Sequence, residues 1–292
     1  MERRLFIALA AAVLAAPSPA SAGMNETAAA RLAELERASG GRLGVAVLDT
    51  GTGRRIAHRA GERFAMCSTS KFFIAAAALA RVDAGRDRLD RRIAYSESDL
   101  LEYAPVTRVH VHAGAMTLGA LCAAAIEYSD NTAANLLLGT IGGPAAVTGY
   151  ARALGDSITR LDRTEPTLNT AIPGDPRDTT TPAAMVGLMK TILLGDVLTP
   201  RSRQQLEMWL AANTTGSARL RAGLAPGWRV GDKTGTGDHG ATNDIAILRP
   251  PGRAPILIAS YYVDSPGPSR RREAVLANVA RVLFSNPFPR PA

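Results

Sequence analysis

Segments with a β-strand pattern lie near the two ends of this chain, and helical patterns fill the middle. Residues 43–48 and 54–60 flank a glycine-rich turn, which predicts a hairpin. Residues 229–235, 243–248 and 255–263 are alternating or continuously apolar, as in strands. Every strand needs a hydrogen-bonded neighbour for its backbone groups. We therefore expect one antiparallel sheet assembled from the N- and C-terminal segments.

Helices are predicted between and beside these strands. Asn25 is a suitable N-cap for the first helix, and Thr181 followed by Pro182 marks another start clearly. The predicted helices cover residues 25–39, 70–84, 117–128, 131–138, 145–154, 181–194, 200–212 and 269–284. The pattern predicts an α+β fold, an α/β sandwich whose sheet is flanked by helices, with an inserted all-helical domain. The expected ranges are 23–62 and 213–292 for the α/β domain and 63–212 for the helical domain, with a functional loop at 160–180.

The first 22 residues have the pattern of a secretory signal peptide. Arg3 and Arg4 precede an apolar stretch at 5–16, and Ala20-Ser21-Ala22 is a cleavage signal of the A-x-A type. Cleavage near Ala22 predicts a periplasmic or secreted protein, and the paired arginines leave open general or twin-arginine export. Beyond residue 20 there is no run of ~18 apolar residues, so no membrane anchor is expected.

The net charge of +8 does not by itself indicate a nucleic-acid partner. Nucleic-acid binding would call for an RNP-like motif, zinc-finger spacing or a long polybasic block, and the longest basic run is Arg270-Arg271-Arg272. We expect no nucleic-acid partner. The two cysteines, Cys67 and Cys122, could form one bridge in an oxidising compartment, but we expect two buried free thiols.

Lysine is scarce, which makes each lysine informative. The chain has 31 Arg and only three Lys, at Lys71, Lys190 and Lys233. Burial can lower the pKa of a lysine ammonium group so that it releases its proton, whereas a guanidinium keeps its proton in proteins. A lysine retained in such a chain is therefore a candidate for chemistry. Two of the three lysines lie in short motifs.

The first motif is Ser68-Thr69-Ser70-Lys71, at the start of a helix that is apolar on most sides. One helical turn separates Ser68 from Lys71, so both side chains can face one cleft. A lysine with a lowered pKa can activate a serine hydroxyl, and a helix N-terminus offers N–H groups to an oxyanion. The motif alone is also compatible with chance.

Two more motifs follow, and each has a structural explanation of its own. Ser129-Asp130-Asn131 suits the N-cap of the helix at 131–138, and the segment Lys233-Thr234-Gly235-Thr236-Gly237 suits a strand end and turn. In the order S-x-x-K, S-D-N and K-T-G, the three motifs resemble the signature set of class A serine β-lactamases and penicillin-binding proteins. The resemblance covers nearly the whole chain after the leader.

A carboxylate distinguishes the two families that share these motifs. The class A enzymes carry a Glu that activates a hydrolytic water, and here Glu165 and Asn169 match the pattern E-x-x-x-N. Arg163 and Asp178 match the ion pair that closes this loop. The resemblance therefore implies hydrolysis of penicillins and cephalosporins, an activity that confers antibiotic resistance, by a monomer without metal or cofactor.

Within class A the chain most resembles the cefotaximase-type enzymes. Cys67 before the nucleophile, Thr164 before the Glu and Thr236-Gly237-Asp238 carry this resemblance. Tyr103 matches an aromatic residue at the substrate entrance. Ala75 stands where many relatives have a cysteine that would pair with Cys122, and Gly237 where carbapenemases have one.

The resemblance implies a role for each site residue. Ser68 is the nucleophile, and Lys71 or Glu165 takes its proton. The N–H groups of Ser68 and Thr236 hold the oxyanion, and Ser129 passes a proton to the leaving nitrogen. The implied substrate-binding residues are Tyr103, Asn131, Asn169, Lys233, Thr234, Gly235 and Thr236. Thr242 stands where many penicillinases have a carboxylate-binding arginine. One of Arg270, Arg271 and Arg272 is a candidate substitute, and the three are equally compatible with the solvated start of the last helix.

Three other functions remain open at this point. A D,D-peptidase and a non-hydrolytic β-lactam sensor share Ser68 and Lys71, but each is expected to lack the function of Glu165. A zinc hydrolase would use His110 and His112, but the four histidines of the chain come without suitable acidic partners.

Overall fold

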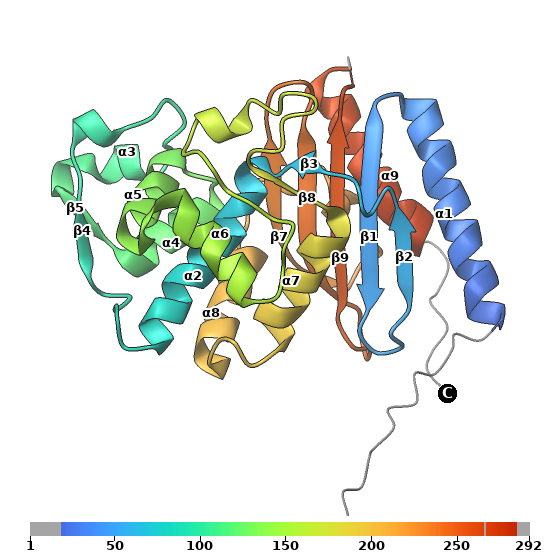
Figure 1. Cartoon of the computed structure of the whole chain (residues 1–292), viewed down its shortest axis with the longest axis horizontal. Coiled ribbons are helices and arrows are strands. Elements are labelled where there is room, and N and C mark those ends of the chain that lie inside the picture. The colour runs from blue at the N-terminus through green and yellow to red at the C-terminus, as the bar shows by residue number, and fades with distance from the viewer. Residues whose placement is uncertain (1–18, 266, 285–292) are drawn as a thin grey trace, which may run out of the picture.

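The five-stranded sheet, drawn in the right half of Figure 1, joins strands from both ends of the chain, as predicted. The computed structural model describes residues 19–265 and 267–284. The sheet has the strand order β2-β1-β9-β8-β7, and all neighbouring strands are antiparallel. Its strands are β1 (Arg42–Asp49), β2 (Arg55–His58), β7 (Arg229–Thr236), β8 (Thr242–Arg249) and β9 (Ile256–Val263).

Helices cover both faces of this sheet. The longer helices are α1 (Pro19–Ser39), α2 (Lys71–Asp83), α4 (Leu118–Glu127), α5 (Asn131–Ile141), α6 (Gly143–Ala153), α7 (Pro182–Leu194), α8 (Pro200–Ala211) and α9 (Ser269–Phe284). Short helical turns are α3 (Thr107–His110), η1 (Cys67–Ser70), η2 (Glu97–Asp99), η3 (Val111–Ala113), η4 (Thr167–Asn169) and η5 (Leu220–Gly223). In Figure 1, α1 and α9 lie together on one side of the sheet and α7 lies on the other.

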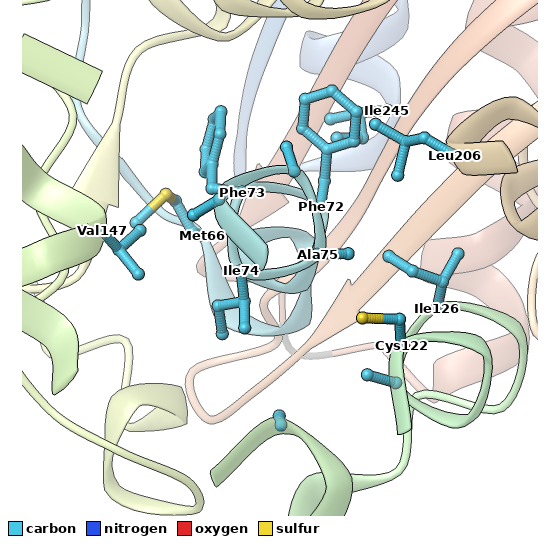
Figure 2. Packing of buried hydrophobic residues seen from close by; sticks show 14 of the residues in the cluster. Met66, Phe72, Phe73, Ile74, Ala75, Cys122, Ile126, Val147, Leu206 and Ile245 are labelled. Atoms are coloured by element: carbon cyan, nitrogen blue, oxygen red, sulfur yellow. The ribbon is translucent and has the colours of Figure 1, made fainter. Parts of the chain in front are cut away.

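Side-chain alternation along the strands separates two cores. On β8, Ile245 and Ile247 pack with α2 and its neighbours, while Ala246 and Leu248 pack with α1 and α9. Figure 2 shows α2 at the centre of the larger core, with labelled side chains on all of its sides. Burying such a helix holds the residues at its N-terminus rigidly.

Three expectations for the fold need correction or remain open. The first helix begins at Pro19 and not at Asn25. Residues 63–212 also contain two short two-stranded sheets, β3 (Phe64–Ala65) with β6 (Thr179–Thr180) and β4 (Arg92–Ala94) with β5 (Ala115–Thr117), which sequence patterns missed. They are two or three residues long, too short to show a periodicity. The boundaries at residues 62 and 212 stay predictions.

The predicted signal peptide lies mostly outside the described residues. Residues 1–18 are not described, and the predicted cleavage site at Ala22 falls within α1. Within the described residues, no helix combines the length and the apolar character needed to cross a membrane.

Candidate active site

Ser68 lies in the short turn η1, which leads directly into the buried helix α2. Cys67, just before it, has a positive φ of 48°. Strand β7 passes close to this turn, because a Cβ added at Gly235 would lie 2.7 Å from the carbonyl oxygen of Met66. The sequence placed Ser68 at the start of the helix, and the structure places it one turn earlier.

Lys71 connects most of the predicted catalytic side chains. Its Nζ lies 2.9 Å from Ser68 Oγ and 2.9 Å from Glu165 Oε1. It also donates to the carbonyl oxygen of Ser129 at 2.7 Å and to Oδ1 of Asn131 at 2.6 Å. Four acceptors therefore surround one ammonium group that is fully buried.

Burial lowers the pKa of Lys71 below its ordinary value of 10.5. The negative charge of Glu165, in contact with the ammonium, acts in the opposite direction and offsets only part of this effect. The neutral amine is thereby easier to reach than in an exposed lysine. A lysine with a lowered pKa is what the scarcity of lysine in the sequence suggested.

Ser129 lies between the two buried lysines. Its Oγ accepts from Lys233 Nζ at 3.0 Å and is 3.4 Å from Lys71 Nζ. Ser129 has a positive φ of 59°, and the next residue, Asp130, caps α5 through the N–H group of Ala133. Burial and the charge of Lys71 lower the pKa of Lys233 well below 10.5. The capping and the catalytic interpretations of S-D-N therefore apply to different residues of the motif.

The loop at 160–180 holds Glu165 over Ser68. Ser68 Oγ donates to Glu165 Oε1 at 3.4 Å, and Asn169 Nδ2 donates to Glu165 Oε2. The side chain of Asn135, on α5, makes two hydrogen bonds of 2.9 Å with the backbone N–H and carbonyl of Glu165. Asn135 was not predicted from the sequence, because it lies outside every motif, although its place on the helix that follows S-D-N was a usable signal. The Glu165–Pro166 peptide bond is cis.

The predicted ion pair closes this loop. Arg163 Nε donates to Asp178 Oδ2 at 2.5 Å, and Asp178 Oδ1 accepts from the backbone N–H groups of Asp162 and Arg163. Gly237 allows the loop to contact β7, because a Cβ there would lie 2.4 Å from the carbonyl oxygen of Asn169. The ends of the loop and its centre are thus held by different contacts.

The edge of β7 carries Thr234 and Thr236 on one face. The guanidinium of Arg219, itself almost completely buried, donates to Thr236 Oγ1 at 2.7 Å and to the carbonyl oxygen of Gly235 at 2.8 Å. Arg219 thus contacts the K-T-G strand directly, and it was not predicted from the sequence because nothing distinguishes it among 31 arginines. Of the three arginines considered, Arg272 lies near Thr242, at 3.2 Å from its Oγ1.

The remaining predicted residues take simpler positions. Tyr103 is 51% exposed and lies beside Asn131, whose N–H donates to its carbonyl oxygen at 3.0 Å. Lys190, the lysine outside the motifs, lies exposed on α7. Cys67 and Cys122 are buried free thiols, which confirms that prediction. Figure 2 shows Cys122 facing Ala75 on α2.

Comparison with known proteins decides the family. The model of the β-lactamase enzyme family matches residues 27–286. The chain belongs to this family. It is 52% identical over 253 residues to β-lactamase CTX-M-8 of Citrobacter amalonaticus, covering 87% of each chain, and 46% identical over 281 residues to β-lactamase OXY-2 of Klebsiella oxytoca, covering 96% and 97%.

Solved structures place the chain in class A of the β-lactamases. An ancestral (GNCA) β-lactamase of class A has a TM-score of 0.87 at 62% identity, covering 88% of this chain and 99% of that one. The putative class A β-lactamase PenP from Rhodopseudomonas palustris has a TM-score of 0.86 at 53% identity, covering 88% and 98%. The predicted fold class and the predicted family are confirmed. The protein is a class A β-lactamase, an enzyme that hydrolyses β-lactams and so confers resistance to them.

Proposed function

We propose that Ser68 opens the β-lactam ring of penicillins and cephalosporins through an acyl-enzyme that Glu165 then hydrolyses. One observation carries this proposal: Lys71 Nζ lies 2.9 Å from both Ser68 Oγ and Glu165 Oε1. A nucleophile and a base within hydrogen-bond reach, with a third group orienting the base, is the arrangement that activates a serine. The oriented base here is a lysine whose neutral form is favoured by burial.

Acylation begins with the loss of the Ser68 proton. The carbonyl oxygen of Ser129 and Oδ1 of Asn131 are permanent acceptors for two N–H bonds of Lys71. Once the third proton of Lys71 has moved to Glu165, the amine lone pair faces Ser68. Lys71 then takes the serine proton across 2.9 Å, a shorter path than the 3.4 Å to Glu165. We therefore propose Lys71 as the acylation base, a role for which the sequence left both Lys71 and Glu165 open.

The ring opens as the Ser68 Oγ–carbon bond forms and the carbon–nitrogen bond of the lactam breaks. The N–H groups of Ser68 and Thr236 stabilise the developing oxyanion in this proposal. The leaving nitrogen takes a proton from Ser129, and Lys71 passes the proton that it took from Ser68 to the Ser129 oxygen, across 3.4 Å. Lys233 holds the same oxygen at 3.0 Å. The substrate carboxylate binds Lys233, Thr234 and Thr236.

Deacylation uses the other side of the site. Asn169 Oδ1 is buried and accepts no hydrogen bond from the described protein residues, so it is available to a water molecule beside Glu165. Glu165 first returns the proton that it took from Lys71, across 2.9 Å. As the carboxylate, it then takes a proton from that water while the water oxygen attacks the ester carbon, and it passes this proton to the Ser68 oxygen as the ester bond breaks. Tyr103 lines the entrance of the cleft.

Mass spectrometry with benzylpenicillin tests the proposed roles of the two residues separately. The Ser68→Ala variant should form no covalent adduct, whereas Glu165→Ala should accumulate the intact acyl-enzyme and stop. A Ser68→Ala adduct would overturn the nucleophile assignment. Full turnover by Glu165→Ala would leave deacylation to another group, and wild type that stays acylated would favour the penicillin-binding peptidase or the sensor.

The finer features of the function are part of the same proposal. We infer hydrolysis of some oxyimino-cephalosporins, because Gly237 leaves no side chain at the end of β7 and Thr236 offers a hydroxyl there. Carbapenem turnover should be poor. We also infer a monomeric enzyme that acts in the periplasm or outside the cell after removal of residues 1–22.

A further inference from the structure

A chain of hydrogen bonds runs from Thr234 on β7 into the loop that follows α8. The hydroxyl oxygens of Thr234 and Thr215 are 2.5 Å apart. Oγ1 of Thr215 is 2.8 Å from Oδ1 of Asn213, and the backbone N–H of Thr215 donates to the same Oδ1 at 3.1 Å. None of the motifs in the sequence includes Thr215 or Asn213.

The direction of each hydrogen bond in this chain follows from its neighbours. A backbone N–H can only donate, so the Asn213 atom that receives it is the carbonyl oxygen and not the amide nitrogen. The Thr215 hydroxyl must therefore donate its single proton to Asn213. The contact between the two threonines then requires Thr234 to donate and Thr215 to accept.

The far end of this chain is fixed to the same strand. Asn213 Nδ2 donates to Asp232 Oδ2 at 2.7 Å, and Arg221 Nε donates to Asp232 Oδ1. The loop lies against Asp232 because residue 216 is a glycine: a Cβ there would lie 1.9 Å from Asp232 Oδ2. Asn213 is buried, so its amide is held in one orientation. We call this set of residues the hydroxyl relay: Thr234, Thr215 and Asn213.

We propose that Thr215 is a positioning residue for substrate binding. By accepting the Thr234 proton, it holds the Thr234 hydroxyl oxygen at the edge of β7 in the free enzyme. The proposal rests on the role given above to Thr234 as a partner of the substrate carboxylate.

Substrate binding then changes one bond of the hydroxyl relay. The Thr234 hydroxyl turns about its Cβ–Oγ1 bond and donates its hydrogen bond to the carboxylate in place of Thr215. The χ1 rotamer of Thr234 does not change. Thr215 keeps its own bond to Asn213. Because the Thr234 rotamer is already fixed, no side-chain entropy is lost at this residue on binding.

Steady-state kinetics with benzylpenicillin and nitrocefin test this role. Thr215→Val keeps the shape of the side chain and removes the acceptor, so the Thr234 side chain can populate other rotamers. KM should then rise about twofold to threefold, the reciprocal of the fraction left in the binding-competent rotamer. The value of kcat should stay within about twofold, because a smaller binding-competent population weakens substrate binding and leaves the bound complex unchanged. Thr215→Ser keeps the acceptor and should restore KM.

Controls separate this proposal from the proposed function. Thr214→Val is a matched control, because the Thr214 hydroxyl donates to the carbonyl oxygen of Glu127 and lies outside the hydroxyl relay. Its KM should equal that of wild type. In a Thr215→Val background, adding Thr234→Val should raise KM no further than Thr234→Val alone, since one relay is removed in both cases.

Three outcomes decide the matter. If Thr234→Val raises KM but Thr215→Val does not, the positioning role is wrong and the carboxylate role stands. If neither variant changes KM, the carboxylate role of Thr234 itself is wrong. If Thr215→Val and a second variant, Thr215→Ala, lose kcat together with thermal stability, the residue supports the fold and the proposal is overturned.

Discussion

The two sides of the active site are held in different ways. Strand β7, which carries Lys233 to Thr236, pairs with β8 along all eight of its residues. The loop at 160–180, which carries Glu165 and Asn169, depends on a few side-chain contacts, chiefly Asn135 and the Arg163–Asp178 ion pair. Backbone pairing is spread over many bonds that no single side chain controls. We therefore expect single substitutions to displace the loop far more readily than the strand.

The largest effect is expected where the two sides meet, at Lys71. Lys71→Arg keeps the charge but cannot release the proton, so kcat/KM for benzylpenicillin should fall by more than ~1000-fold. Lys190→Arg, on the exposed face of α7, is the matched control and should equal wild type. Equal activities of the two variants would show that the loss of the Lys71 proton is not needed.

Asn135→Leu tests the loop directly. Removing both hydrogen bonds to the Glu165 backbone should shift the carboxylate and slow deacylation about 100-fold, the cost of a displacement near 1 Å. Pre-steady-state kinetics should show a burst with a slow second phase. Asn278→Leu, on α9, is the control for the substitution itself. An unchanged deacylation rate would mean that the ion pair alone holds the loop.

Thr236→Ala tests the strand, where a smaller effect is expected. The backbone pairing of β7 remains, so only one hydroxyl contact is lost, and kcat/KM for cefotaxime should fall about tenfold. Benzylpenicillin should be affected less. A larger loss for benzylpenicillin would remove the inferred link between Thr236 and cephalosporins.

The smallest effect concerns stability on the strand side. Burial and the nearby Asp232 raise the pKa of Asp244 on β8 well above 3.8. Between 3.8 and that raised pKa the folded state binds more protons than the unfolded state, so this group makes stability fall as pH rises. The Tm of Asp244→Asn relative to wild type should therefore increase by a few °C as pH rises from 4 to 7. A constant difference across this range would contradict the assignment.

Most of this architecture could be predicted from the sequence, because hydrophobic periodicity indicates the strands and helices and the order of the motifs indicates the site. The strands at both ends, the long helices and the Ser68, Ser129 and Lys233 motifs were all identified from local residues. Asn135 and Arg219 were not, since their roles arise only when α5 contacts the loop and when the residue just before η5 contacts β7. One arginine among 31 gives no signal in sequence, while one lysine among three does. The predicted start of the first helix at Asn25 was wrong, because a favourable cap residue does not require a helix to begin at that residue.

The order of strands in the sheet has a consequence for how the enzyme is made. Strand β1 lies between β2 and β9, and its Val45 pairs with Ser260, about 215 residues later in the chain. Contacts between such distant residues form slowly, because a long loop must close first. During synthesis, the sheet cannot be completed until nearly the whole polypeptide has left the ribosome. A nascent chain of this topology therefore stays incompletely folded until late in its synthesis, and its unpaired strand edges stay exposed during that time.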